Sequence, residues 1–227
     1  MHLETVWAYA CVRFGFHSTA MHCGDTMNKI VCDEKNEDDK KKEAGSDPLA
    51  EKFLKTRQIL LSGEVSEELA EKIVRQLLIL EADNDKPIYV YIDSPGGDVD
   101  AGFAIFDTIR FVNAPVYTVG MGLVASAAAL ILLAAPKERR LGFPHSHYLI
   151  HQPSSGMKGV ATDIEIHAAE SAKTKAKLND IIAQETGTAL EKVAHDTDRD
   201  YWLSADEAKD YGLISRVVST RSELAAN

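Results

Sequence analysis

Cysteine, tryptophan and long apolar runs are scarce in this chain of 227 residues, which has three cysteines and two tryptophans. All the cysteines, Cys11, Cys23 and Cys32, lie in the first 32 residues. The rest of the chain has no cysteine, which excludes a disulfide framework there. This pattern fits a reducing compartment, and we expect a cytoplasmic protein. The apolar residues 6–16 are too short to cross a bilayer and are interrupted by Arg13, so we expect neither a membrane anchor nor a signal peptide.

Basic residues are also fewer than acidic ones. The chain has 25 Lys and Arg against 35 Asp and Glu, a formal net charge of -10. Nucleic-acid binding needs clustered basic side chains to neutralise phosphates, so we expect no nucleic-acid partner. Hydrophobic residues make up 45% of the chain, which is ordinary for a globular protein with one sizeable core.

The first part of the chain has the composition of a poorly ordered segment. Residues 33–43 are a run of charged and amide side chains without apolar periodicity. We predict a charged, poorly ordered extension over residues 1–47, a single domain over residues 48–220 and a short tail over residues 221–227. Met27 opens the stretch that leads into the charge run, so the sequence leaves open whether translation starts there or at Met1.

Metal binding is an alternative interpretation of two groups of side chains: Cys23 and Cys32 with His17 and His22, and His145, His147 and His151. The spacing of the first group matches no zinc pattern. The three histidines of the second group would share one face of an extended strand, but no cysteine or acidic residue nearby completes a ligand set. We therefore expect no metal.

Helical and strand patterns alternate from residue 48 onward. Ser66 is a plausible N-cap for a helix whose apolar residues are Leu69, Ile73, Leu77 and Leu80. A strand over residues 88–92, a turn over 94–97 and a second helix around Ile105, Ile109 and Val112 follow. A strand over residues 115–119 then leads to a small-residue helix over 126–135, which we expect to be buried on all sides.

The remaining third continues the alternation. Residues 147–151 are strand-like, and Thr162 to Glu165 has the form of a capping box for a long helix that Gly187 ends. A second capping box at residues 204–207 opens a short helix that stops at Gly212, and residues 213–218 form the last predicted strand. Strands alternating with helices predict βαβ units and a mainly parallel α/β sheet.

Three residues have the types and contexts of an acyl-transfer site. Ser126 lies where a strand gives way to the buried helix, His151 ends a strand, and Asp200 closes Asp-Thr-Asp-Arg-Asp. A serine hydroxyl attacks a carbonyl when a histidine takes its proton, and a carboxylate holds that histidine in the right tautomer. We assign the oxyanion hole to the backbone amides of Gly97 and Ala127. The ordinary interpretations stay open here, because Ser-Pro-Gly-Gly is usually a tight turn and a serine at a helix start is usually a cap.

Residues 53–218 resemble the proteolytic subunits of the ATP-dependent Clp protease, the ClpP family. The most specific pieces are Tyr-Ile-Asp-Ser-Pro-Gly-Gly at 91–97, Ile-His-Gln-Pro at 150–153, Ala-Thr-Asp-Ile-Glu-Ile-His-Ala at 161–168, Asp-Thr-Asp-Arg-Asp at 196–200 and Ser-Ala-Asp-Glu-Ala-Lys-Asp-Tyr-Gly-Leu-Ile at 204–214. Coincidence does not produce all five pieces in order.

The resemblance implies a ClpP/crotonase-like α/β fold with a protruding handle helix, and two stacked heptameric rings that form a tetradecamer. It implies a serine endopeptidase in which Ser126 is the nucleophile, His151 the base and Asp200 its orienting carboxylate. It also places Tyr91 in the docking pocket for a Clp ATPase of the ClpX, ClpA or ClpC type, and Asp198 and Arg199 at the ring contact. The substrates would be unfolded polypeptides, and no cofactor is expected, since ATP is used by the partner.

Two departures from the family pattern motivate an alternative. Ala128 stands where the family usually has glycine, which predicts an extra methyl group beside the nucleophile and a lower or narrower activity. The family's axial loop is replaced by the charged run, which bears on ATPase docking. The alternative is a weakly active or non-catalytic paralogue that completes a mixed ring. A third reading is a crotonase-fold acyl-CoA hydratase or isomerase, in which the three residues would have no role.

Overall fold

A single sheet organises the part of the chain that the computed structural model describes, residues 48–154 and 156–224. The predicted extension over residues 1–47, with Met27 and the three cysteines, lies outside these residues. Within them the strands are β1 (Gln58–Ser62), β2 (Ile88–Ser94), β3 (Val116–Ala125), β4 (Arg140–Gly142), β5 (His147–Ile150), β6 (Tyr201–Ser204) and β7 (Arg216–Val217). All seven belong to one sheet, and only the β5–β6 pair is antiparallel. The predicted mainly parallel α/β fold is therefore confirmed.

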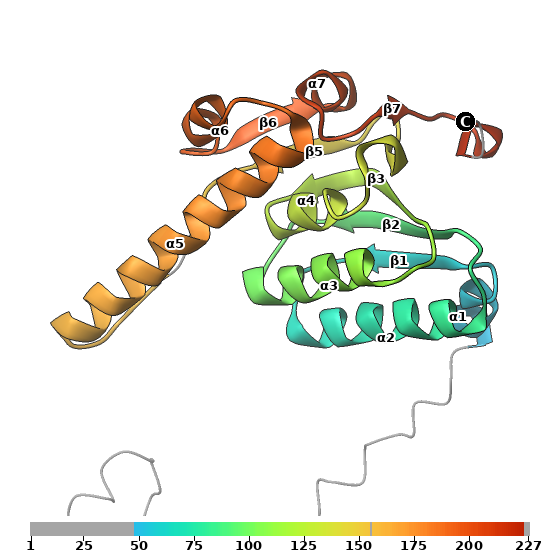
Figure 1. Ribbon diagram of the computed structural model, residues 1–227, viewed down its shortest axis with the longest axis horizontal. Coiled ribbons are helices and arrows are strands. Elements are labelled where there is room, and N and C mark those ends of the chain that lie inside the picture. The colour runs from blue at the N-terminus through green and yellow to red at the C-terminus, as the bar shows by residue number, and fades with distance from the viewer. Residues whose placement is uncertain (1–47, 155, 225–227) are drawn as a thin grey trace, which may run out of the picture. The chain divides into compact units, whose positions relative to one another are not determined.

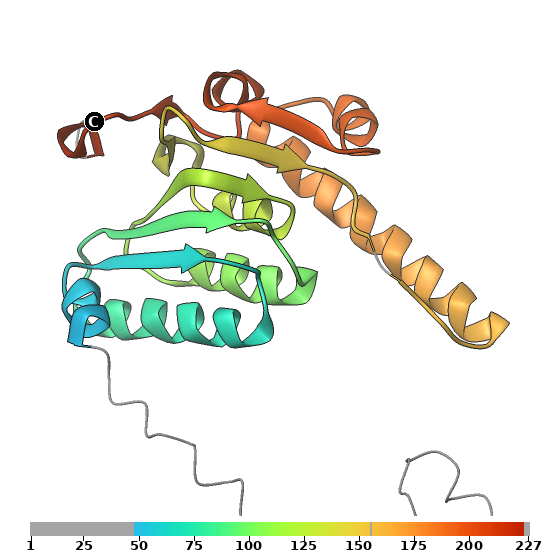
Figure 2. The same cartoon turned by 180° about the vertical axis from the view of Figure 1, so that it is seen from behind.

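Helices cover one face of this sheet (Figure 1). They are α2 (Glu67–Asp83), α3 (Val99–Phe111) and α4 (Ala127–Leu132), while α1 (Pro48–Leu54) precedes β1. The turned view in Figure 2 brings the strands to the front, with α4 behind them and α2 below β1. Burial alternates along β2, where Ile88, Val90 and Ile92 are buried and Tyr89 and Tyr91 are only partly buried. This alternation follows from the period-two geometry of a strand whose two faces meet different surroundings.

The central strand β3 changes partners along its length. Its first half pairs with β4, through Thr118 to Gly120, and its second half pairs with β5, through Leu123 to Ala125. The change coincides with an irregularity against β2, where Ile92 faces Gly120 but Ser94 faces Val124. The sheet therefore forks within β3, and one branch of the fork leads directly into Ser126.

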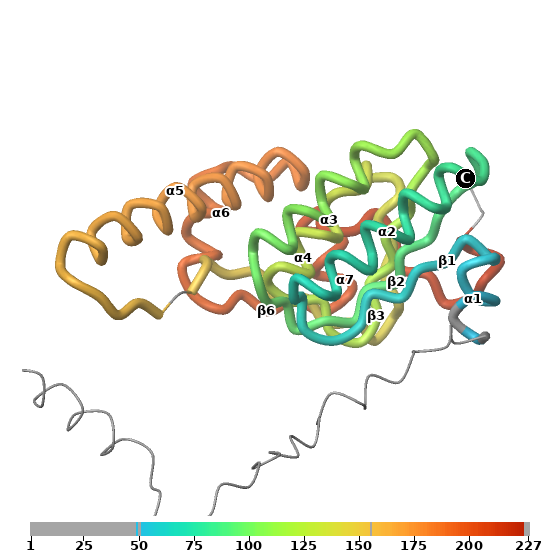
Figure 3. Tube along the Cα trace, turned by 90° about the horizontal axis from the view of Figure 1, so that it is seen from below, coloured from blue at the N-terminus to red at the C-terminus, as the bar shows by residue number. Residues whose placement is uncertain are grey.

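The C-terminal part surrounds the long helix α5 (Ala161–Thr186). Its remaining elements are α6 (Leu190–Asp196), α7 (Ala205–Tyr211) and the short 3-10 helix η3 (Arg221–Leu224), and an earlier 3-10 turn, η2 (Lys137–Arg139), precedes β4. Figures 1 and 3 show α6 beside the C-terminal part of α5, whose other end extends away from the sheet. The first ten residues of α5 are exposed, and its buried residues, Asn179, Ile182 and Thr186, lie in its second half.

Several predicted caps and boundaries are confirmed. Ser66 caps α2 by accepting a hydrogen bond from the backbone of Leu69. Ser204 and Glu207 form the predicted capping box of α7, and Gly187 and Gly212 end their helices in the left-handed conformation that favours glycine. The helix after Ser126 is buried on all sides, as predicted, although it is shorter than expected.

Other local predictions are wrong. Thr162 does not cap α5, because the helix has already begun at Ala161 and its N-cap is Val160, which makes no side-chain cap. The strand predicted over residues 115–119 continues to Ala125, through the irregularity in its pairing with β2. The last strand, predicted over residues 213–218, is only Arg216–Val217. Among the described residues, no helix combines the length and the apolar composition that a bilayer crossing requires.

Candidate active site

Ser126 occupies a sharp turn between β3 and α4. Its backbone has φ 57° and ψ -122°, a conformation that is strained for a residue with a side chain. Its amide donates a hydrogen bond to the Leu149 carbonyl oxygen at 2.9 Å, which ties the turn to the end of β5. The hydroxyl makes no capping hydrogen bond to α4, so the interpretation of Ser126 as an ordinary helix cap fails.

Gly96 packs against the Ser126 turn without room for a side chain. A Cβ at Gly96 would lie 2.6 Å from the Ala125 carbonyl oxygen and 2.7 Å from Ser126 Cβ, and the Gly96 φ is +90°. The Gly96 amide is held by Ser94 Oγ at 3.1 Å. The Ser-Pro-Gly-Gly segment is thus a turn, and its glycine is required because the backbone lies against the serine.

Gly97 follows Gly96, and its amide is unused by the neighbouring bridge. Val65 and Gly97 form an isolated parallel bridge, in which Val65 N donates to Gly96 O at 2.8 Å and Asp98 N donates to Val65 O at 2.8 Å. In a parallel bridge of this kind the central residue directs its own N–H away from the partner strand. The first amide of α4, Ala127 N–H, likewise has no partner within a helix that starts at that residue.

His151 and Asp200 form a pair beside this turn. His151 follows the last residue of β5, and its Nδ1 lies 3.1 Å from Asp200 Oδ1. The imidazole is 24% exposed and the carboxylate 63% exposed, so the pair lies at the surface of the single subunit. A carboxylate that accepts from Nδ1–H leaves Nε2 free to take a proton from a neighbouring hydroxyl.

The loop that carries Asp200 is anchored to β5 and α5. The Gln152 amide donates to the Thr197 carbonyl oxygen at 2.6 Å, and the Thr197 hydroxyl lies 2.8 Å from both Asn179 Oδ1 and the Val193 carbonyl oxygen. Thr197 and Asn179 are buried. Buried and satisfied hydrogen bonds of this kind restrict a loop to one position, and they hold Asp200 opposite His151.

Asp196, one residue before Thr197, is at the centre of a second network. Its carboxylate accepts from Lys192 Nζ at 2.6 Å and from the Tyr211 hydroxyl at 3.0 Å, and His195 Nδ1 lies 3.3 Å away. Burial raises the pKa of this carboxyl, but the hydrogen bonds from Lys192, His195 and Tyr211 outweigh it, so the pKa is lowered. Asp196 therefore stays charged at neutral pH. Its hydrogen bond with Tyr211 ties the start of the loop that carries Asp200 to α7.

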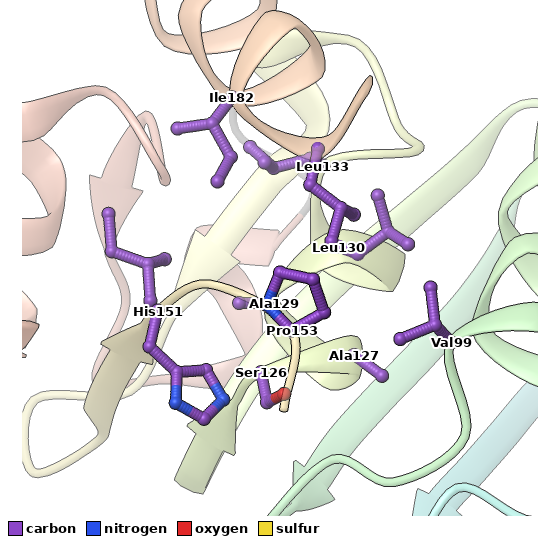
Figure 4. A pocket seen from close by; sticks show the side chains of 11 residues that line it. Val99, Ser126, Ala127, Ala129, Leu130, Leu133, His151, Pro153 and Ile182 are labelled. Atoms are coloured by element: carbon purple, nitrogen blue, oxygen red, sulfur yellow. The ribbon is translucent and has the colours of Figure 1, made fainter. Parts of the chain in front are cut away.

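An apolar pocket opens beside Ser126 and His151 (Figure 4). Apart from these two residues its lining is entirely apolar: Val99, Ala127, Ala129, Leu130, Leu133, Ile150, Pro153, Leu178 and Ile182. In Figure 4 the side chains of Ser126 and His151 lie at one end of the pocket, and those of Leu133 and Ile182 lie at the other. Such a pocket takes an apolar side chain of a ligand and leaves the polar pair at its mouth.

Helix α5 contributes one wall of the pocket and is held in place by a buried arginine. Arg140 Nε donates to the Ala135 carbonyl oxygen at 2.7 Å, and Arg140 Nη2 pairs with Glu185 Oε2 at 2.5 Å. Glu185 also pairs with Arg110 of α3. Leu178 and Ile182, four residues apart on α5, therefore stay against the pocket. Sequence reasoning did not assign these two residues to the site, although their helical spacing marks one apolar face.

Ala128 does not lie where the sequence suggested. Its side chain is fully buried in the hydrophobic core, whereas its neighbours Ala127 and Ala129 line the pocket. Successive residues of a helix point about 100° apart, so the methyl group of Ala128 faces the core. The structure therefore gives no ground for expecting Ala128 to narrow the pocket.

Asp93 is a residue of the site that sequence reasoning missed. Its Oδ1 accepts a hydrogen bond from the Leu123 amide at 3.0 Å, inside the irregular part of β3. Gly122, with φ +54°, comes so close that a Cβ there would lie 2.5 Å from Asp93 Oδ1. The carboxylate thus closes the bulge that aims the end of β3 at the active-site turn. The only signal in the sequence was the pair of glycines, Gly120 and Gly122.

Three other predicted residues lie away from the pocket. Tyr91 lies on β2 in a group with Phe143, 6.4 Å between ring centroids, and burial raises the pKa of its phenol. Asp198 and Arg199 are exposed in the loop before Asp200. Asp198 Oδ1 lies 3.2 Å from Lys175 Nζ, whose hydrogen bond lowers the pKa of the carboxyl, and Arg199 Nη1 donates to the Asp198 carbonyl oxygen at 3.4 Å.

The arrangement of histidines differs from the expected one. His147 is exposed on β5, but His145 precedes the strand, in a turn where the Ser146 amide donates to the Phe143 carbonyl oxygen, and His151 follows the strand. The three histidines therefore do not share a strand face. Over residues 48–154 and 156–224, no group of three or more His, Cys, Asp or Glu side chains is arranged to hold a metal ion.

Comparison with known proteins identifies the relatives of this fold and site. The model of the family described as Clp protease matches residues 40–221. The chain belongs to the Clp protease family. The ATP-dependent Clp protease proteolytic subunit 2 of Treponema denticola is 64% identical over 199 residues, covering 87% of this chain and 98% of that protein. The proteolytic subunit 3 of Rhizobium etli is 49% identical over 193 residues, covering 84% of this chain and 99% of that protein.

The fold agrees with this family. A mutant of ClpP1 from Listeria monocytogenes has a similar solved structure, with a TM-score of 0.73 and 44% identity, covering 78% of this chain and 99% of that one. The predicted ClpP-like fold is confirmed, and the chain is a serine-type endopeptidase of the ClpP type.

Proposed function

We propose that the chain hydrolyses unfolded polypeptides to short peptides through an acyl-enzyme formed on Ser126. The observation that carries the proposal is His151, which lines the same pocket as Ser126 and whose Nδ1 lies 3.1 Å from Asp200 Oδ1. The proposal assigns the oxyanion hole to the amides of Gly97 and Ala127, and Ala127 lines the pocket beside Ser126. A metal or a bound cofactor has no part in this proposal.

The chemistry follows from the roles of these groups. Ser126 Oγ attacks the carbonyl carbon of the scissile peptide bond while His151 Nε2 takes the hydroxyl proton, and Asp200 stabilises the resulting imidazolium. The amides of Gly97 and Ala127 stabilise the oxyanion. His151 then gives the proton to the leaving amine, which departs and leaves an ester on Ser126. A water molecule, deprotonated by His151, attacks that ester and releases the carboxylic acid product and the serine.

The pocket sets which side chain precedes the cleaved bond. Because its lining is apolar apart from the two catalytic candidates, we propose that it takes a large aliphatic or aromatic side chain. Burying such a side chain contributes roughly 1.5–3 kcal/mol of hydrophobic free energy. A charged side chain would lose its hydration without gaining a partner there.

Substitution of Ser126 tests the catalytic assignment. We expect Ser126→Ala to abolish cleavage of a fluorogenic peptide and labelling by a fluorophosphonate, while Ser219→Ala, an exposed serine remote from the pocket in sequence, retains both. We expect Asp200→Asn to lower kcat strongly with the fold intact, because an amide favours the wrong imidazole tautomer. Undiminished cleavage by Ser126→Ala would refute the assignment.

Self-assembly into two stacked heptameric rings is part of the proposal. The exposed apolar side chains around the start of α5 are what a partner subunit would cover: Val160 (66% exposed), Ile164 (43%) and Ile166 (57%). Asp198 and Arg199 project from the exposed loop next to α5 and would lie at the ring contact, where they act structurally. Native mass spectrometry of the purified chain tests this, and a monomer at micromolar concentration contradicts it.

A Clp ATPase of the ClpX, ClpA or ClpC type is the proposed partner that unfolds substrates and consumes ATP. The supporting feature is the aromatic group on the sheet face opposite α2 and α3: Tyr89, Tyr91, Tyr117 and Phe143. Tyr91→Ala is expected to reduce ATP-dependent protein degradation but to leave small-peptide cleavage unchanged. We propose a cytoplasmic location, and the net charge of -10 favours no nucleic-acid partner.

A mixed ring with a second paralogue is the alternative. The relatives from Treponema denticola and Rhizobium etli carry the numbers 2 and 3 in their names, which favours asking whether this subunit works alone. If the purified chain forms tetradecamers and cleaves a peptide by itself, the non-catalytic alternative fails.

A further inference from the structure

Tyr148 fills the fork of the sheet from the strand that leads to His151. It is fully buried on β5, where it pairs with Val124 of β3. Its hydroxyl oxygen lies 2.9 Å from Ser146 Oγ, and burial raises its pKa to about 12, so it is a neutral phenol at any physiological pH. Nothing in the proposed chemistry uses this side chain.

Two glycines leave the space that the phenol occupies. A Cβ at Gly120 of β3 would lie 2.5 Å from the Tyr148 hydroxyl oxygen, and a Cβ at Gly142 of β4 would overlap the same atom. Neither glycine has a φ in the left-handed region, so the backbone alone does not demand glycine at these positions. The reason for glycine is steric, since the phenol lies across both strands at the point where β3 leaves β4 and joins β5.

The same fork sets the distance between the two catalytic candidates. Ser126 follows the last residue of β3 and His151 follows the last residue of β5, and the Ser126 amide donates to the Leu149 carbonyl oxygen at 2.9 Å. A shift of β5 along or away from β3 therefore moves the imidazole relative to the hydroxyl.

We propose that Tyr148, packed against Gly120 and Gly142, is a positioning residue that seats β5 on β3 and so fixes His151 opposite Ser126. This rests on the proposed function of those two residues. Tyr148 does not line the pocket, so it acts on the geometry of the reacting groups and leaves substrate binding unaffected. Its effect should therefore appear in kcat and in the rate of fluorophosphonate labelling, with little change in KM.

Gly142→Ala and its combination with Tyr148→Phe form the test in the assembled full-length protein. Gly142→Ala places a methyl group on the Tyr148 hydroxyl, and we expect kcat to fall about tenfold, since a misplacement of 1 Å costs about 100-fold. Tyr148→Phe removes the overlapped atom, and the other close atom, Ile214 Cδ1 at 2.8 Å, ends a flexible side chain. The double variant should therefore recover kcat to the level of Tyr148→Phe alone, within about threefold of the wild type.

Two controls separate the possible causes. Ile73→Val removes a methyl group from the buried face of α2, remote from the fork, and should lower thermal stability while kcat stays unchanged. Ser126→Ala monitors the proposed function: cleavage that persists in this variant refutes that function rather than the positioning role.

The outcomes decide the proposal. A lower kcat and labelling rate for Gly142→Ala at unchanged KM, with rescue in the double variant, support it. An unchanged kcat in the assembled Gly142→Ala variant, or a loss that Tyr148→Phe does not rescue, overturns it. If Gly142→Ala does not assemble, Tyr148→Phe alone decides, because loss of the hydroxyl should lower kcat about threefold through misplacement and an unchanged kcat again overturns the proposal.

Discussion

Gly96→Ala is the substitution whose effect on activity follows most directly from the structure. The new Cβ would lie 2.6 Å from the Ala125 carbonyl oxygen and 2.7 Å from Ser126 Cβ, whereas ordinary contact begins at 3.4 Å. The difference between 3.4 and 2.6 Å is roughly 0.8 Å, which the Ser126 turn or the Gly96 segment has to move. Because a displacement of about 1 Å at reacting groups costs about 100-fold in rate, we expect kcat to fall roughly 10- to 100-fold.

Gly63→Ala is the matched control for this experiment. Gly63 has φ +89°, almost the same as the +90° of Gly96, but a Cβ there meets nothing within 4 Å. Both variants lose about 1–2 kcal/mol of stability because a side chain is placed in the left-handed region, and the close contacts add to this loss in Gly96→Ala alone. Only Gly96→Ala should lose kcat with a fluorogenic peptide. Equal kcat in the two variants would refute the conclusion that position 96 requires glycine because its backbone lies against the Ser126 turn.

Three further predictions concern Asp93, Asp196 and Ile182. Asp93→Ala should lower kcat about tenfold by releasing the β3 bulge, while Asp93→Asn, which keeps an acceptor oxygen, should stay near the wild type in steady-state kinetics. Asp196 has a lowered pKa, so its contribution to stability is present above the ordinary aspartate pKa of about 3.9 and is lost as the pH falls through the folded value. Asp196→Asn should therefore make the free energy of unfolding in urea less dependent on pH over that acid range. An unchanged pH dependence would contradict this. Ile182→Val should reduce kcat/KM about tenfold for a peptide with leucine before the cleaved bond, as one methylene in an apolar pocket is worth about 1–3 kcal/mol, and an equal effect on a peptide with alanine there would argue against the pocket.

Much of the fold could be predicted because local signals agreed with tertiary packing. The apolar spacing behind Ser66, the short strand after Pro87 and the capping box at Ser204 each specify one element without help from distant residues. These elements also fix the direction of the parallel sheet. The local agreement explains why the α/β class was recoverable from the sequence.

Other features depended on contacts that no local pattern encodes. Thr162 and Glu165 have the composition of a capping box, but α5 already begins at Ala161, so the box lies inside the helix. The irregularity in β3 depends on Asp93, a residue 30 positions away from the Leu123 amide that it binds. The methyl group of Ala128 could be placed in the core only once the direction of α4 was known.

The pairing of β5 with β6 has a consequence for how the protein is made. His151 and Asp200 are 49 residues apart in sequence, and the loop that carries Asp200 leads directly into β6, the only antiparallel strand of the described sheet. Chains fold from the N-terminus as they are synthesised, so the proposed nucleophile and base emerge well before the carboxylate proposed to orient them. If the three residues act as proposed, a nascent chain is a poor peptidase until its last quarter has folded, so the order of synthesis itself delays the onset of proteolysis.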